Sequence, residues 1–206
     1  MKTKALLLLI LVQGSILAQS KWKKKIDAPE VHSLSIELGF IQNVMVSTGN
    51  SDQYVIKTTS EGEYRDQVML VSKEVDHWLE IYPQWVPSFI APNDKLSAHK
   101  VRALNLELIV PKGKTLEIRG EQAVVSVLGE YKEVVLRLGS GRVNLKHSSE
   151  ESDIRTDSAD VFLTIPHGDI RASSAEGKVI GSIPLNTRFH YKLASEKGTI
   201  YLNKAE

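Results

Sequence analysis

The sequence contains no cysteine. This absence excludes a disulfide framework, a thiolate metal site, a cysteine nucleophile and a lipid anchor attached through a thiol. The chain also lacks a surplus of charge, because 26 lysine and arginine residues face 25 aspartate and glutamate residues among 206. A general nucleic-acid-binding protein needs a positive surplus to neutralise phosphates. The balance therefore argues against nucleic acid as a partner.

Long apolar runs are absent except at the N-terminus. There, residues 5–12 are all apolar, two lysines precede them, and small residues follow. A charged start, a short apolar core and a small-residue cleavage site are typical of a secretory signal peptide. The run is much shorter than the roughly 20 apolar residues of a membrane-spanning helix. We therefore predict a signal peptide over residues 1–20, cleaved after Ala18 or, as second choice, after Ser20, and no transmembrane span in the mature chain.

Removal of the leader changes the charge balance. Lys2 and Lys4 leave with it, so 24 basic residues remain against 25 acidic ones. The mature chain then begins with a basic segment, Lys-Trp-Lys-Lys-Lys at residues 21–25, which offers charge to an anionic surface. Because chain termini are usually loose, we predict that residues 21–30 form a solvated basic tail.

The rest of the chain shows the alternation of apolar and polar residues that is typical of half-buried strands. Turn-forming clusters rich in Gly, Asn, Ser and Pro separate these segments, and no stretch shows the apolar spacing of an amphipathic helix. An irregular stretch, residues 85–100, predicts a loop inserted between strands. We expect one all-β domain over residues 31–206, with an N-terminal β-rich portion. The predicted strands include residues 34–40, 44–46, 54–58, 68–71, 78–82 and 104–110.

The second half of the sequence repeats itself. An apolar or aromatic residue followed by a base recurs at nearly regular intervals, at Ile118-Arg119, Leu136-Arg137, Ile154-Arg155, Ile170-Arg171 and Tyr191-Lys192. A second apolar column recurs at three equal steps, at Val125, Val143, Val161 and Val179, and Ile200 follows after a slightly longer one. A block of this length cannot bury its own apolar face, whereas stacked blocks pair every backbone group and share one core. The four valines are predicted to stack in one inward-facing column. The Arg and Lys residues of the repeated pairs are predicted to point outward, with acidic residues near them. A β-sandwich of irregular hairpins stays open as the alternative.

Several segments of the chain resemble the bacterial "putative auto-transporter adhesin" family with the head GIN domain and related exported domains. The resemblance covers most of the mature chain and rests on alternating strands and Gly/Ser turns, at residues 40–46, 54–56, 79–81, 106–111, 116–120 and 138–145. It implies a right-handed parallel β-helix-like solenoid in an exported protein, in the periplasm or on the cell surface of a Gram-negative, Bacteroidetes-like bacterium. The resemblance supplies no catalytic residues.

Candidate catalytic and metal-binding groups are weak in this sequence. The spacing of the histidines His147, His167 and His190 is out of step with the repeat of the valine column, so no metal site is predicted. Ser148, His147 and Asp153 offer the residue types of a hydrolase triad without a nucleophile elbow, and we interpret them as turn residues. Acidic residues in turns could pair as a sugar-cleaving or calcium site, and we interpret them as solvated charges; they are Glu150, Glu151, Asp153, Asp157 and Asp160.

Four aromatic residues form the best candidate binding site in the sequence. They lie close together along the chain, at Trp78, Tyr82, Trp85 and Phe89. If Leu79 and Ile81 face the core, alternation places Trp78 and Tyr82 on the outer face, where aromatic rings could stack on a sugar or bind a protein. The competing interpretation is that these rings cover the end of the repeat array, because terminal repeats need a cap.

These observations predict a class of protein without fixing its ligand. We expect a non-enzymatic cell-envelope module, adhesin-like or structural, that uses no cofactor and presents its turns and the loop at 85–100 to a glycan or a protein of the cell envelope. The alternative is a carbohydrate-active enzyme on a β-helix scaffold. Two convergent carboxylates in a cleft would favour the enzyme, whereas a decorated surface without them would favour the module.

Overall fold

A computed structural model describes residues 20–61, 65–89 and 103–205. The predicted signal peptide, except for Ser20, lies outside these residues, and so do positions 90–100 of the predicted loop.

The described chain is all-β, as predicted, and its one helical element is the short 3-10 turn η1 (Arg65–Gln67). None of its helical segments is long and apolar enough to span a membrane. The strands are β1 (Ser20–Asp27), β2 (Ser33–Glu37), β3 (Ile41–Gly49), β4 (Gln53–Glu61), β5 (Val68–Val75), β6 (Trp78–Trp85), β7 (Ala103–Pro111), β8 (Thr115–Thr156), β9 (Asp160–Ile165), β10 (Asp169–Ser174), β11 (Val179–Gly181), β12 (His190–Ser195) and β13 (Ile200–Lys204).

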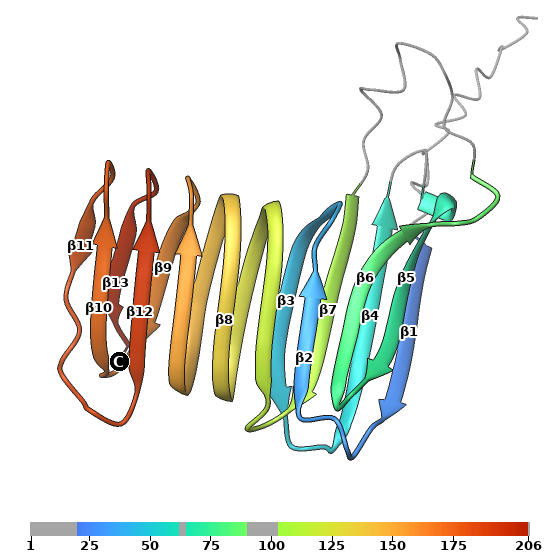
Figure 1. The fold of residues 1–206 in the computed structure, drawn as a ribbon, viewed down its shortest axis with the longest axis horizontal. Coiled ribbons are helices and arrows are strands. Elements are labelled where there is room, and N and C mark those ends of the chain that lie inside the picture. Colours follow the sequence, from blue (N-terminus) through green and yellow to red (C-terminus); the bar gives the residue numbers. More distant parts are fainter. Residues whose placement is uncertain (1–19, 62–64, 90–102, 206) are drawn as a thin grey trace, which may run out of the picture.

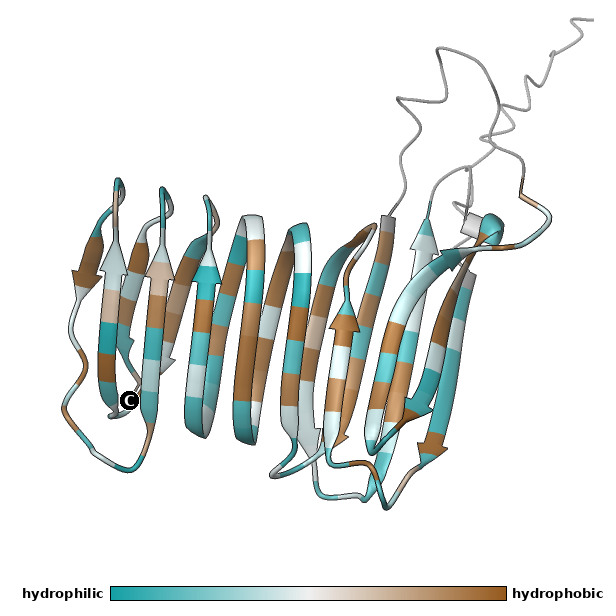
Figure 2. Ribbon diagram, viewed as in Figure 1, coloured by the Kyte–Doolittle hydropathy of each residue, from teal (hydrophilic) through white to brown (hydrophobic). Residues whose placement is uncertain are grey.

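The strands lie side by side along the length of the molecule, and β8 winds back and forth between two walls (Figure 1). The β2 wall contains β2, β5, β6, β10, β12 and the β8 segments 115–119 and 151–156. The β3 wall contains β1, β3, β4, β7, β9, β11, β13 and the β8 segments 124–128 and 142–145. Along the strands, apolar residues alternate with polar ones (Figure 2). The inward-facing apolar residues form one continuous core between the walls.

Parallel pairing between successive repeats disagrees with the β-sandwich alternative. Val143 pairs with Val161 and Arg142 with Asp160, so β8 and β9 run parallel in the register that the valine column predicted. The strands β9, β12 and β13 also pair in parallel with their neighbours. A sandwich of hairpins would require antiparallel pairs here, and the antiparallel pairs in the described sheet are β1–β4, β4–β7 and β5–β6.

The last repeat is out of sequence order in space. Val161 of β9 pairs with Ile200 of β13, and Ile200 in turn pairs with Val179 of β11. On the β2 wall, β12 likewise lies between β8 and β10. After β9 the chain therefore passes beyond the next position to form β10 and β11, and then returns to fill the gap. The prediction that Val179 stacks directly on Val161 is wrong for this reason, although both belong to one column.

The position of a valine in this column sets its contribution to stability. Val161 is fully buried between two neighbours, whereas Val179 lies at the end of the column and is 41% exposed. We expect Val161→Ala to lower the free energy of unfolding by about 2 kcal/mol, because it leaves a cavity in the core. Val179→Ala, the matched control, should cost less than about 0.5 kcal/mol. Urea unfolding of both variants measures the difference, and equal costs would contradict the rung order described above.

The N-terminal segment is not the loose tail that the sequence suggested. Residues 20–27 form β1, which pairs antiparallel with β4 from Ser20 opposite Ser60 to Asp27 opposite Gln53. Strand β4 offers an otherwise open edge, and Ile26 packs against the core. The basic segment is therefore held on the sheet, and its lysines are placed by strand alternation.

The outward-facing column of basic residues includes Arg137 and Arg155, and the acidic residue Asp153 lies beside it, as predicted. Asp153 accepts hydrogen bonds from the Nε and Nη2 atoms of Arg155 at 3.1 and 3.0 Å, and Arg137 Nη2 lies 3.2 Å from its Oδ2. Partial burial opposes ionisation of Asp153, but the hydrogen bonds and charges of the two arginines outweigh it and hold the pKa of this carboxyl below its usual range. The carboxylate of Asp153 therefore reduces the repulsion between Arg137 and Arg155, which belong to successive repeats.

Candidate functional site

The four aromatic residues predicted to bind do not share one face, because three lie on β6 with both alternations and Phe89 follows this strand. Trp78 and Tyr82 share one face, and both are partly exposed. Trp85 lies on the opposite face of the strand and stacks on Phe40, with ring centroids 5.0 Å apart. Phe89 stacks on Trp85 at 4.5 Å. The structure therefore brings Trp85 and Phe89 together with Phe40, which packs against the core, and places Trp78 and Tyr82 elsewhere. Binding by any of the four stays a prediction.

The candidate histidines occupy three separate environments. His147 is buried, His167 stacks on Phe189 with centroids 6.0 Å apart, and His190 lies 3.1 Å from Asp169 through its Nδ1 atom. Among residues 20–61, 65–89 and 103–205, no group of three His, Asp or Glu side chains could hold a metal ion.

His147 belongs to a buried polar network in place of a hydrolase triad. Its Nε2 atom lies 3.0 Å from Ser152 Oγ, and Ser152 Oγ lies 2.6 Å from Ser149 Oγ. The three residues are at most 3% exposed. Burial lowers the pKa of His147 to about 3, so its ring is neutral at ordinary pH. A hydroxyl sealed in the core cannot reach a substrate, and neither Ser148 nor Asp153 contributes to these hydrogen bonds. The network is a structural one.

The acidic stretch does not converge on a cleft. Asp153 is held by two arginines, and Asp160 Oδ1 accepts a hydrogen bond from the backbone N–H of Thr199 at 2.8 Å. Glu150 and Glu151 lie within β8, Asp157 follows directly after it, and all three are exposed. Asp153 and Asp160 therefore have structural partners, and the interpretation of the rest as solvated charges agrees with their exposure.

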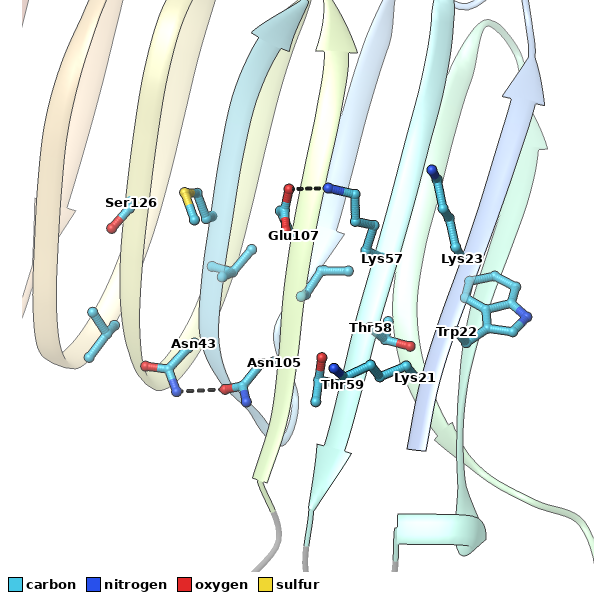
Figure 3. Close-up of a pocket in the computed structure, with 14 residues that line it drawn as sticks. Lys21, Trp22, Lys23, Asn43, Lys57, Thr58, Thr59, Asn105, Glu107 and Ser126 are labelled. Atoms are coloured by element: carbon cyan, nitrogen blue, oxygen red, sulfur yellow. Dashed lines mark hydrogen bonds and ion pairs between the residues drawn. The ribbon is translucent and has the colours of Figure 1, made fainter. Parts of the chain in front are cut away.

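A groove on the outer surface of the β3 wall combines the features of a binding site (Figure 3). It has a volume of about 620 Å³, within the range of ligand pockets, and crosses β1, β4, β7, β3 and the following segment of β8. Most of its lining side chains come from alternate, outward positions of these strands. We call it the outer groove; its lining includes Lys21, Lys23, Asn43, Met45, Lys57, Thr59, Asn105, Glu107, Val124 and Ser126.

Cross-strand register builds the outer groove in two rows. Lys23, Lys57, Glu107, Met45 and Ser126 lie opposite one another on successive strands. The other row contains Lys21, Thr59, Asn105, Asn43 and Val124. Since directly opposite residues on neighbouring strands lie close together, each row can present several side chains to one extended ligand.

The outer groove contains two polar pairs with apolar side chains beside them. Asn43 Nδ2 donates a hydrogen bond to Asn105 Oδ1 at 2.7 Å, which fixes both amides and leaves further donors and acceptors free for a ligand. Lys57 Nζ lies 2.5 Å from Glu107 Oε1. Met45 lies opposite Glu107 and is 45% exposed, and Val124 lies opposite Asn43 and is 39% exposed, so the floor has apolar patches beside these pairs.

The alternation of lysines in residues 21–25 was a signal for the outer groove, but we interpreted this segment as a solvated tail. Lys21, Lys23 and Lys25 alternate with Trp22 and Lys24, which is the period of a strand with one basic face. The partner strand carries Lys57 and Thr59 at the matching period. The two segments are distant in the sequence, and their pairing could not be read from either one alone.

Comparisons with known proteins identify a shared fold and no family. No family model matches the chain, and no curated protein matches it. A solved structure described as a "putative cell adhesion protein" from Clostridium sporogenes is 12% identical, covers 91% of this chain and 100% of its own, and has a TM-score of 0.54. A "putative adhesin" from Bacteroides fragilis is 9% identical over 90% of this chain and 98% of its own, with a TM-score of 0.37. The first likeness shows a common fold, and the second is too distant to carry an argument.

Proposed function

We propose that this protein is an exported, adhesin-like module of the cell envelope that binds a glycan in the outer groove without catalysis. The observation that carries the proposal is the ordered amide pair Asn43–Asn105 beside exposed apolar side chains. Amides hydrogen-bond sugar hydroxyls, and apolar side chains cover the C–H faces of sugar rings. The fold shared with a protein described as a "putative cell adhesion protein" is consistent with this class.

The proposal includes the finer details of architecture and location. We take the stacked repeats as a right-handed parallel β-helix-like solenoid, since parallel crossovers are nearly always right-handed. Export follows from the leader at residues 1–20, and membership of the head GIN domain family from the resemblance of the strands and turns. The periplasm or the cell surface of a Gram-negative bacterium is the matching location.

The composition of the groove favours binding over hydrolysis. Glycoside hydrolysis ordinarily needs two carboxyl groups flanking the scissile bond. Among the described residues that line the outer groove, Glu107 is the one acid, and it is ion-paired with Lys57. The enzyme alternative would therefore have to use another surface.

A glycan array of the mature protein tests the function. We expect Asn43→Ala combined with Asn105→Ala to weaken binding about tenfold or more, because two ligand-facing amides are lost. Asn203→Ala, an exposed amide on β13 outside the groove, is the matched control and should bind as the unmodified protein does.

Two further results decide between the alternatives. Binding lost in Tyr82→Ala and Trp85→Ala, with the asparagine variant unaffected, would place the site on the aromatic residues of β6. Turnover of a glycan that disappears in Asp157→Ala or Asp160→Ala would replace the module with an enzyme. An array without any bound glycan would overturn the proposal.

A further inference from the structure

Three lysines collect at one end of the outer groove. Alternation along β1 places Lys21 and Lys23 on the outer face of the sheet, and the register places them opposite Thr59 and Lys57 (Figure 3). Lys24 has the opposite alternation, and its Nζ atom donates a hydrogen bond to Ser72 Oγ at 2.8 Å. The basic segment of the mature N-terminus therefore divides its charges between two faces, and the groove receives two of them.

The charge at this end of the groove is not balanced. Glu107 pairs with Lys57, and neither Lys21 nor Lys23 makes an ion pair with any residue that the structure describes. Lys23 and Lys57 are direct cross-strand partners on the same face, an arrangement that is destabilising for like charges. An anion bound between these side chains would remove that repulsion and would gain charge-assisted hydrogen bonds.

The groove is extended as well as basic. It crosses five adjacent strands, and four spacings of about 4.8 Å give a length of about 19 Å. The amide pair, the hydroxyl of Ser126 and the apolar side chains of Met45 and Val124 occupy the part beyond the lysines, whereas Thr59 lies opposite Lys21. A small ion would fill a fraction of this length, whereas a linear chain of sugar rings would contact all of it.

We infer that the ligand of the outer groove is an acidic glycan, with a carboxylate or sulfate group held by Lys21, Lys23 and Lys57 and its rings lying across Asn105, Asn43, Met45 and Val124. This inference rests on the proposed function and adds the chemical class of the ligand. It also gives β1 a role, because the strand supplies two of the three cations.

Binding of defined oligosaccharides to the mature protein tests the inference. The probes are an oligogalacturonate, a hyaluronan oligomer and a chondroitin sulfate oligomer, with the methyl-esterified oligogalacturonate as the neutral counterpart. We expect at least one acidic oligomer to bind about tenfold or more tightly than the ester, and its affinity to fall as salt is raised. Lys21→Gln combined with Lys23→Gln should weaken that binding about tenfold or more while leaving the fold intact, since both side chains are exposed.

The matched control is Lys24→Gln, which removes the same charge from the opposite face of β1. Lysines also protect an edge strand from pairing with another chain, and Lys24 shares that effect without facing the groove. If Lys24→Gln weakens binding as much as the Lys21 and Lys23 changes do, the charges act through the strand as a whole and the inference fails.

The remaining outcomes separate the inference from the proposed function. Equal binding of the acid and its ester, lost in the Asn43 and Asn105 variants, would keep a glycan-binding module and overturn the acidic ligand. Equal binding of poly-L-glutamate, or binding of phosphatidylglycerol vesicles in preference to every oligomer, would replace the glycan with a polyanion or a membrane surface. Binding of none of the acidic oligomers would overturn the inference directly.

Discussion

Gly141→Ala is expected to lower the free energy of unfolding by about 3 kcal/mol, one of the largest effects of any single methyl group in this chain. Gly141 has a φ of +113°, in a region that residues with a side chain rarely adopt. A Cβ atom there would also overlap the carbonyl oxygen of Ala123, which belongs to the preceding, neighbouring rung. Because the backbone is less able to move than a flexible side chain, the two segments of β8 that contain Gly141 and Ala123 would have to shift apart.

Gly113→Ala separates the two causes. Gly113 also has a positive φ, of +70°, but no atom beyond its two chain neighbours lies within 4 Å of the position of an added Cβ. This variant should lose only the conformational preference, about 1 kcal/mol. The difference appears as a thermal midpoint lower by about 10 °C for Gly141→Ala and by about 3 °C for Gly113→Ala. Similar midpoints would show that the rungs do not approach each other at this corner as described.

Acidification is expected to destabilise the fold through His147. Burial lowers its pKa from 6.5 to about 3, so between these values the unfolded chain binds a proton that the folded chain excludes. The contribution of the neutral His147 ring to the free energy of unfolding is complete above pH 6.5. It is lost as the pH falls, by about 1.4 kcal/mol per pH unit. Over two pH units, down to about pH 4.5, the loss from this residue alone should reach about 3 kcal/mol.

The measurement is the slope of the free energy of unfolding against pH between about 6.5 and 4.5. His147→Phe keeps an aromatic ring between Tyr131 and Tyr191, whose centroids lie 5.9 and 5.6 Å from that of the histidine, and it cannot titrate. We expect the slope to flatten in this variant whatever its stability at neutral pH. His32→Gln, at an exposed position, is the control and should keep the slope of the unmodified protein. An unchanged slope in His147→Phe would mean that the ring is solvated in the folded state.

Much of the fold was predictable because strand alternation is a local signal. The pairs Leu79/Ile81 and Leu106/Leu108 are buried, as their period indicated. The recurrence of Val143 at Val161 also predicted the register of β8 on β9. The stack of Trp85 on Phe40 was not foreseen, because the two residues are far apart in the sequence and neither segment identifies the other.

The alternation of residues along the chain was enough to predict an all-β protein with buried and exposed faces, because side-chain direction in a strand depends only on the parity of the position. The sequence also predicted the length of the repeat, since the recurrence of apolar residues at equal steps is written along the chain. The folded arrangement was needed to see that β12 and β13 lie between earlier strands, and that β1 joins β4 to complete the outer groove. These pairings could not be predicted because any strand with free backbone groups can pair with any open edge. The choice of edge depends on which rungs and side chains the rest of the chain has already placed there.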